Sequence, residues 1–324
     1  MWFMRQAGRS LPEYRALRGE GSILDAIKRP DLAAEFTMQP VRRYGVDAAV
    51  LYSDIVVSSH AVGFGIDVAP GTGPVADNPL RSAADLNRLR PLDAETDMGY
   101  VMETIDILVD ELTVPLLGFA GAPFTVASYL IEGRPSRTYE NTFAMLRHEP
   151  VLWGNVMERL TQHAVELVDR QITHGARAFQ IFDSWIGALD VATYRSSVLP
   201  HTRALFAELR RLHPAVPGIH FGVGCSHLLE AMNEAGASVL GVDQTVGLDE
   251  VRRRVGADVV LQGNLDPAAV LAGHDAAIAA TDAVLAANAG HPGHIFNLGH
   301  GVTPQCDPDV LHAVVRHVHE RTRR

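Results

Sequence analysis

Two arginines near the start of the chain have the chemistry and the placement to bind an anion. Arg5 and Arg9 stand close together and follow the apolar run Trp2–Met4, which predicts a buried strand. Directly after them, Ser10–Glu13 has the Ser-x-x-Glu form of a helix capping box, with a proline in its first turn. Guanidinium groups and the free N–H groups of a helix N-terminus both favour anions. We therefore predict an anion site here, with an ordinary solvated loop as the alternative.

Four further polar residues follow short apolar runs later in the chain. Asp54 and Ser184 each come just after such a run, and either could simply cap the following helix. Tyr129 could be a core tyrosine whose hydroxyl is satisfied. His300 stands between two glycines, which let a ligand approach the backbone closely, so ligand contact is the favoured interpretation. For the other three, the residues alone leave both interpretations open.

The composition predicts a globular protein that binds neither nucleic acid nor a membrane. Of the 324 residues, 47% are hydrophobic and 20% are charged, which is typical of a folded domain. A net charge of −10 argues against nucleic acid or an anionic membrane surface as the main partner. The uncharged stretch 113–131 contains prolines and glycines, so it fits a buried strand and a loop better than a membrane span. An acidic ligand would need basic residues gathered locally.

The cysteines, histidines and the lysine indicate the cellular compartment and limit the kinds of catalysis that the chain could carry out. Cys225 and Cys306 lack paired spacing, and no signal-peptide pattern opens the chain, so we predict a reducing, cytoplasmic location. These cysteines form no metal-ligand pair with His220 or His227, so no metal site is predicted. Lys28 is the only lysine and lies in an early helix or loop, which removes many Schiff-base mechanisms.

Short apolar runs alternate with helical patterns along the whole chain. Continuous apolar runs, rather than alternating ones, are typical of strands that are covered on both faces. The expected strands are 2–4, 48–52, 115–119, 178–182, 218–222, 239–242, 259–262 and 294–298. The expected helices are 30–43, 101–112, 151–174, 191–212, 228–235, 248–255, 267–288 and 308–319.

Eight strand–helix units predict an α/β fold, a (β/α)₈ TIM barrel, as a single domain over residues 1–324. The active site of such a barrel lies where the strands end, which is where the polar residues described above stand. A doubly wound open sheet is the alternative, but no Gly-x-Gly-x-x-Gly follows an early strand.

Several motifs, in order along the chain, resemble those of the uroporphyrinogen decarboxylase family. The run Met4–Arg9 is similar to the family's N-terminal signature, and Gly118–Gly133 is similar to its second signature. Further similar blocks are Tyr52–Ile55, Phe182–Trp185, Gln262–Pro267 and Asn297–Gly301. The resemblance covers essentially the whole chain. It departs from the family in having few residues ahead of Trp2, and in Gln244, where many relatives have tryptophan.

The resemblance implies a distorted (β/α)₈ barrel, usually a homodimer, that needs no metal or organic cofactor. It also implies the conversion of uroporphyrinogen III to coproporphyrinogen III in haem biosynthesis, with four acetate carboxyl groups leaving as carbon dioxide. Carried over by motif, the implied substrate contacts are Arg5, Gln6, Ala7, Gly8, Arg9, Asp54, Tyr129, Ser184 and His300. Asp54 and Arg5 are the expected catalytic residues.

Two rival functions remain at this point. A corrinoid or thiol methyltransferase on the same barrel would use zinc held by a His-x-Cys pair after the fifth strand. Here His220 is followed by Phe221 and Gly222, so that pair is absent. A tetrapyrrole carrier without catalytic activity is the second rival, and only the combination of arginine and aspartate at strand ends argues against it.

Overall fold

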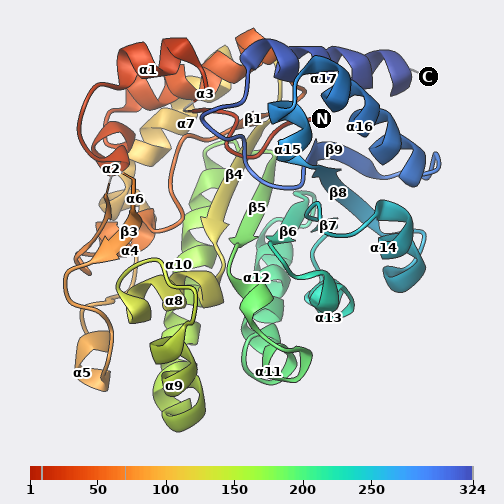
Figure 1. Ribbon diagram of the computed structural model, residues 1–324. Coiled ribbons are helices and arrows are strands. Elements are labelled where there is room, and N and C mark those ends of the chain that lie inside the picture. The colour runs from red at the N-terminus through yellow and green to blue at the C-terminus, as the bar shows by residue number, and fades with distance from the viewer. Residues whose placement is uncertain (9, 70, 323–324) are drawn as a thin grey trace.

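A curved parallel sheet forms the centre of the molecule. The computed structural model describes residues 1–8, 10–69 and 71–322. The strands of the sheet are β1 (Ala49–Val50), β4 (Leu116–Gly121), β5 (Ala178–Asp183), β6 (Gly218–Gly222), β7 (Val239–Gly241), β8 (Val260–Leu265) and β9 (His294–Leu298). Their order across the sheet is the order along the chain, and the sheet curls into a half-barrel with helices around it (Figure 1). The predicted TIM-like barrel is therefore confirmed as a half-barrel.

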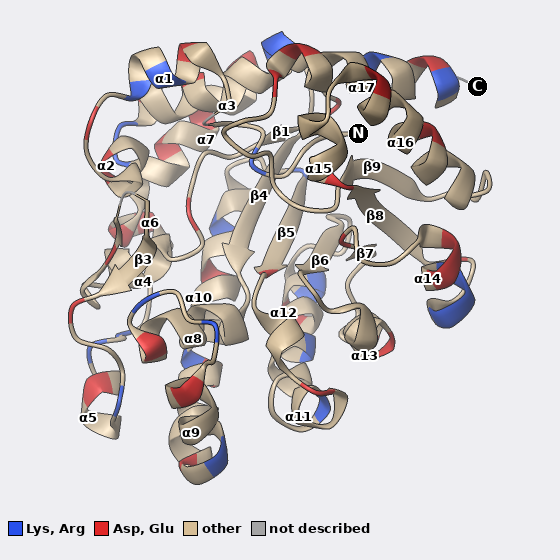
Figure 2. Ribbon diagram, in the orientation of Figure 1, with Lys and Arg blue, Asp and Glu red and all other residues tan. Residues whose placement is uncertain are grey.

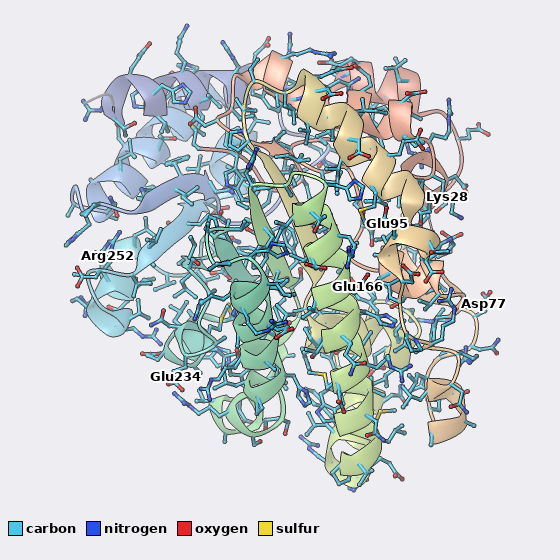
Figure 3. All side chains as sticks on the ribbon, turned by 180° about the vertical axis from the view of Figure 1, so that it is seen from behind. Lys28, Asp77, Glu95, Glu166, Glu234 and Arg252 are labelled. Atoms are coloured by element: carbon cyan, nitrogen blue, oxygen red, sulfur yellow. The ribbon has the colours of Figure 1, made fainter. Side chains whose placement is uncertain are left out.

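The strands form because both faces of each are covered. Every residue of β4 and of β6 is buried, which explains their continuous apolar runs. Neighbours pair in parallel, for example Leu117 with Ala178 and Phe179 with Gly218. Each parallel pair needs a crossover connection, which here runs through helices on the outer face. Figure 3 shows α10 (Pro150–Thr173) and α12 (Leu199–Leu212) on that outer face, seen from behind.

The helices largely follow the predicted segments. The remaining helices are α1 (Pro12–Arg18), α2 (Ile23–Ile27), α3 (Pro30–Tyr44), α4 (Val57–Ala61), α5 (Ala83–Leu86), α6 (Ala94–Asp97), α7 (Gly99–Glu111), α8 (Pro123–Glu132), α9 (Glu140–His148), α11 (Val191–Ser197), α13 (Leu229–Asn233), α14 (Leu248–Val255), α15 (Pro267–Leu271), α16 (His274–Ala287) and α17 (Pro308–Thr322). Two 3₁₀ turns are η1 (Ile186–Ala188) and η2 (Ser226–Leu228). Acidic and basic residues lie mainly on these outer helices and on loops, while the central strands are almost free of them (Figure 2).

The first predicted strand is wrong. Residues 1–3 have no regular secondary structure and residues 4–5 form a turn. The segment makes only isolated main-chain hydrogen bonds to the two ends of the curved sheet. The N–H of Trp2 donates to the carbonyl of Phe296 in β9 at 3.3 Å, and the N–H of Asp47 donates to the carbonyl of Met1 at 2.8 Å. The chain then turns, because the N–H of Gln6 donates back to Phe3 at 3.2 Å and Arg5 has a φ of +56°. This N-terminal segment thus spans the gap between β9 and β1 without becoming a ladder strand.

The capping box predicted at Ser10–Glu13 is also wrong. Helix α1 begins after Leu11, with Pro12 in its first turn as predicted, but no side chain caps it. The hydroxyl of Ser10 instead contacts the Tyr44 hydroxyl at 3.2 Å. Because α3 packs against this segment, the Ser10 hydroxyl bonds to Tyr44 of α3 instead of capping α1.

Other differences come from helix breakers and from burial. The predicted helix 191–212 divides at Val198, because α12 begins anew at Leu199 with Pro200 in its first turn. The predicted helix 267–288 divides before Gly273, whose φ is +101°. The loop expected at the end of 113–131 is helix α8, which is apolar on nearly all sides because it is buried.

An antiparallel hairpin, β2 (Ile66–Ala69) and β3 (Gly73–Ala76), was not expected from the sequence. It packs beside α8, and the N–H of Ala76 donates to the carbonyl of Gly133 at 2.8 Å. Within the described part of the chain, every helix is too short or too polar to cross a bilayer.

Candidate active site

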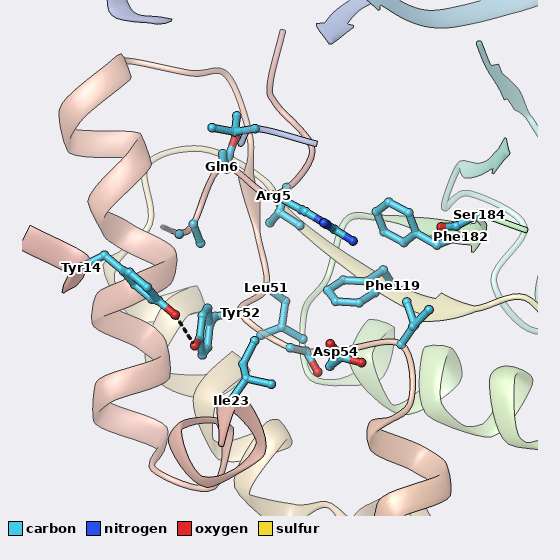
Figure 4. A pocket seen from close by; sticks show the side chains of 16 residues that line it. Arg5, Gln6, Tyr14, Ile23, Leu51, Tyr52, Asp54, Phe119, Phe182 and Ser184 are labelled. Atoms are coloured by element: carbon cyan, nitrogen blue, oxygen red, sulfur yellow. Dashed lines mark hydrogen bonds between the residues drawn. The ribbon is translucent and has the colours of Figure 1, made fainter. Parts of the chain in front are cut away.

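A pocket opens where β4 and β5 end, beside the N-terminal segment. Its volume is about 940 Å³, including space open to solvent. Arg5, Asp54 and Ser184 line it from three different parts of the chain, and Phe119 and Phe182 form an apolar wall between them (Figure 4). Active sites of (β/α)₈ proteins lie at this end of the strands. The fold therefore brings together residues that the sequence predicted separately.

Backbone geometry presents Arg5 to the pocket. The neighbouring Met4 is held by its N–H, which donates to Asn297 Oδ1 at 3.0 Å, and by its carbonyl, which accepts from Val302 N–H at 2.8 Å. Arg5 itself has a φ of +56°, a conformation that non-glycine residues adopt rarely and often at functional sites. Its side chain is exposed and passes directly over Gly301, where a Cβ atom would lie 2.6 Å from Arg5 Cδ. Gly301 is therefore required for this placement of Arg5.

The rest of the predicted N-terminal signature has a mixed outcome. Ala7 and Gly8 line the pocket, as predicted substrate contacts should. Gln6 also borders it, but its buried side chain is committed to the protein: Oε1 accepts from Phe3 N–H at 3.0 Å and Nε2 donates to Ala48 carbonyl at 2.9 Å. Arg9 lies outside the described residues. Gln6 thus holds the segment in position, and its contact with substrate stays a prediction.

Asp54 follows β1 and is half-buried at the pocket. Its Oδ1 accepts from Val56 N–H at 3.1 Å, which shapes the loop before α4. The helix itself has no side-chain cap, so helix capping is not the role of Asp54. The carboxyl group of Asp54 faces the same space as Phe119 (Figure 4).

Tyr129 contacts Trp185, the residue that follows Ser184. Tyr129 lies on α8, and its ring packs on that of Trp185 with centroids 3.8 Å apart. Burial and then the negative charge of Asp54 raise the pKa of Tyr129, while Arg5 acts against this. Tyr129 is therefore a neutral hydroxyl within electrostatic reach of both predicted catalytic residues. It does not line the pocket itself, whereas Ser184, next to Trp185, does.

His300 lies beside Arg5. Its Nδ1 accepts from Gly301 N–H at 2.8 Å, so the neutral ring carries its proton on Nε2 and can donate from there. Burial and then the positive charge of Arg5 lower the pKa of His300, with Asp243 opposing. At neutral pH the ring is therefore an uncharged donor. Like Tyr129, it borders the site without lining the pocket described above.

Other strand-end carboxylates are occupied elsewhere. Asp243 accepts from the N–H groups of Gly224 and Thr245 and so ties two loops together, although an aspartate just after a strand most often caps the next helix. Asp183 is fully buried and accepts from Thr125 Oγ1 at 2.8 Å, so it is not a cap either. Among the described residues no group of three or more histidine, cysteine or acidic side chains is arranged to hold a metal ion.

Sequence reasoning missed the aromatic walls. Phe119 and Phe182 meet edge to face with centroids 5.3 Å apart. The hydroxyls of Tyr14 and Tyr52 are 2.9 Å apart at another side of the pocket (Figure 4). Phe119 and Phe182 belong to apolar runs in which inward and outward positions look alike. Only the alternation of side chains along β4 and β5, once the strands are placed, identifies them.

Comparison with known proteins decides the family. The uroporphyrinogen decarboxylase (URO-D) family model matches residues 1–321. The chain belongs to the uroporphyrinogen decarboxylase family. A relative of that name from Streptomyces coelicolor is 53% identical over all of this chain and 91% of its own length. Another from Salinispora tropica is 52% identical over all of this chain and 87% of its own length. The family predicted from the motifs is confirmed.

Solved structures that resemble this member of the uroporphyrinogen decarboxylase family support the fold alone. A methyltransferase from Methanosarcina mazei superimposes with a TM-score of 0.76, covering 100% of this chain and 92% of its own, at 18% identity. A B12-independent methionine synthase from a Shewanella species gives a TM-score of 0.56 at 10% identity, covering 90% of this chain and 88% of its own. At such identities the likeness carries no conclusion about activity.

Proposed function

We propose that this chain removes the four acetate carboxyl groups of uroporphyrinogen III as carbon dioxide and releases coproporphyrinogen III, a step of haem biosynthesis. Residues 1–324 would act as one domain in this reaction. The observation that carries the proposal is the convergence of Arg5 and Asp54 on one pocket in a chain of this family. Relatives that share about half of its residues are named for this activity.

Asp54 is the proposed centre of substrate binding. The substrate is a flexible ring of four pyrroles, and its four N–H groups can point inward to a single carboxylate. Each charge-assisted hydrogen bond contributes roughly 1.5–3 kcal/mol net. Phe119 and Phe182 offer the pyrrole faces an apolar surface, which also keeps water from competing for the carboxylate.

The same carboxylate stabilises the reaction intermediate. Protonation of a ring carbon makes a cation that accepts the electrons of the breaking C–CO₂ bond. A carboxylate ~4 Å from that cation at an effective dielectric constant of ~20 stabilises it by about 4 kcal/mol. This corresponds to roughly a thousandfold in rate. The substrate thus provides its own electron sink, and the protein provides the charge beneath it.

The cationic and neutral donors bind the peripheral carboxylates. Arg5 is exposed in the pocket and can pair with the leaving acetate group or its neighbours, bidentate where geometry allows. Ser184 and the Nε2–H of His300 are further donors, and Arg9 has the same proposed role. Tyr129, kept neutral by burial, would position a carboxylate or another polar group.

The decisive test compares Asp54→Asn with wild type. We expect wild type, stripped of metal ions, to convert uroporphyrinogen through partly decarboxylated intermediates to the tetracarboxylate product. Asp54→Asn should fold normally but lose turnover of all four acetates, by at least about a thousandfold. Product analysis by liquid chromatography measures both. The matched control is Asp77→Asn, the same change at an exposed loop position, which should leave turnover intact.

Other outcomes would point elsewhere. Near-normal carbon dioxide release from Asp54→Asn would remove that residue from the mechanism. A wild-type protein that binds uroporphyrinogen but releases no carbon dioxide would be a tetrapyrrole carrier.

We further propose that the chain is a cytoplasmic homodimer, as the family resemblance implies. Sedimentation equilibrium of the purified protein tests the dimer directly, and cell fractionation tests the location. A monomer across the concentrations used in the assay would contradict the first proposal.

A further inference from the structure

A fully buried polar cluster lies directly behind the rim of the pocket. Thr125, in the first turn of α8, and Asp183, the last residue of β5, are both completely buried. Thr125 Oγ1 lies 2.8 Å from Asp183 Oδ1, and the N–H of Trp185 lies 3.2 Å from the same Oγ1. The other oxygen, Asp183 Oδ2, lies 3.4 Å from Nε2 of the buried His220.

The direction of these hydrogen bonds is fixed by chemistry. A backbone N–H can only donate, so Trp185 donates to Thr125 Oγ1. The hydroxyl has one proton, and its acceptor is the Asp183 carboxylate. The single hydroxyl therefore bridges two points on either side of Ser184. A carboxylate fixes the orientation of that hydroxyl more strongly than a neutral acceptor would.

The bridge lies next to residues that border the pocket. Ser184 stands between the two anchored positions and lines the pocket. The ring of Trp185 packs on Tyr129 at 3.8 Å and on Tyr139 at 5.1 Å, measured between centroids. Tyr129 in turn senses the charges of Asp54 and Arg5. The positions of Ser184 and Trp185 therefore depend on one buried hydroxyl, that of Thr125.

We propose that Thr125 and Asp183 are positioning residues for substrate binding, and that they act through the turn that carries Ser184 and Trp185. They touch no substrate themselves. They fix Ser184 as a donor to a peripheral carboxylate and Trp185 as a support for Tyr129. This inference rests on the proposed function. Because Asp54 and Arg5 come from other elements, the bridge governs affinity for the polycarboxylate more than the rate of the chemical step.

Thr125→Val tests the proposal, because it removes the hydroxyl and keeps the shape of the side chain. We expect KM for uroporphyrinogen to rise about tenfold, because a misplaced Ser184 would lose its hydrogen bond to a substrate carboxylate, with kcat changed by less than about threefold. Thr125→Ser restores the hydroxyl and should return KM to within about twofold of wild type. Amide hydrogen exchange of a peptide covering 182–189 should be faster in Thr125→Val and normal in Thr125→Ser.

A matched control separates the turn from general stability. Thr281 is equally buried and its hydroxyl donates to the Ala277 carbonyl within α16 at 2.8 Å. Thr281→Val should change neither KM nor the exchange of peptide 182–189. If Thr125→Val does not fold, Thr125→Ala removes the same hydroxyl without placing a methyl group against Asp183 and is judged by the same measurements.

Three results would overturn the proposal: unchanged KM in a folded variant that lacks the hydroxyl, failure of Thr125→Ser to restore KM, or a fall in kcat without a change in KM. Failure of the proposed function is seen separately, as a wild-type protein that releases no carbon dioxide. The exchange measurement does not depend on that activity.

Discussion

At the scale of single residues, the site depends on glycines as much as on charged groups. Arg5 reaches the pocket across Gly301, whose N–H also fixes the tautomer of His300. Gly121 lets Val126 and the loop at Ile55 pack against β4, since a Cβ at Gly121 would lie 2.5 Å from Val126 Cγ2 and 2.9 Å from the Ile55 carbonyl oxygen. Such positions carry no reactive group, yet they decide where the reactive groups lie.

Gly301→Ala should therefore act on catalysis through Arg5. The new methyl group would lie 2.6 Å from Cδ and 2.8 Å from Cγ of Arg5, close to the backbone end of that side chain, so Arg5 must move. We expect kcat/KM to fall about a hundredfold, the usual effect of displacing a catalytic group by about 1 Å. Steady-state kinetics with uroporphyrinogen measures this.

Gly154→Ala is the control for this experiment. Gly154 lies inside α10, and the position that an added methyl group would take has no neighbouring atom within 4 Å, so activity should be unchanged. The free energy of unfolding of this variant should rise by about 0.5–1 kcal/mol. Equal activity of Gly301→Ala and wild type would mean that Arg5 has no required position.

At the scale of elements, the N-terminal segment links the two edges of the half-barrel where a strand was expected. It bridges β9 and the residues before β1 and carries Arg5 to the pocket. Its anchor is Gln6, whose completely buried side chain satisfies the N–H of Phe3 and the carbonyl of Ala48. The stability of the N-terminal segment and the placement of Arg5 are therefore coupled.

Gln6→Ala should lower the stability of the protein and disturb the placement of Arg5. Two buried backbone groups lose their partners and a cavity forms, so we expect the free energy of unfolding to fall by about 2–4 kcal/mol. Urea denaturation measures it, and kcat/KM should fall in the same variant. Gln162→Ala, at an exposed position of α10, should change stability by less than about 0.5 kcal/mol. A Gln6→Ala protein as stable as that control would refute the anchoring role.

At the scale of the whole molecule, the chain carries a net charge of −10, although its pocket is proposed to bind a polyanion. Charged residues are spread over the outer helices (Figure 2), and many form surface ion pairs that contribute little to stability.

A buried titratable group has a larger effect on the free energy of unfolding than these surface pairs. His163 on α10 is buried, and its Nε2–H donates to the Arg90 carbonyl at 2.7 Å. Burial lowers the pKa of His163 to about 4.

This lowered pKa predicts acid sensitivity with a defined sign. The folded state disfavours protonated His163, so its full contribution to stability is present above the ordinary pKa of 6.5 and is lost as the pH falls toward 4. Between pH 7.5 and pH 5 we expect a loss of about 2 kcal/mol from this group. His163→Gln keeps an N–H donor but does not titrate, so its stability should fall less over that range. Urea denaturation at both pH values measures the difference, and equal losses in both proteins would exclude His163 as the source.

The sequence by itself determined the parallel sheet and the family, and it named residues that the fold brings to one pocket. Strands covered on both faces must be continuously apolar, so runs such as 178–182 and 218–222 were recognisable without any partner. Arg5, Asp54 and Ser184 were predicted and do line one pocket. Only the tertiary structure decided that residues 2–4 are no strand, that Gln6 points into the protein, and that Thr125 and Asp183 support the rim. These outcomes depend on which groups from distant parts of the chain meet, because a hydrogen-bond partner or an inward-facing ring is fixed by packing and not by its neighbours in sequence.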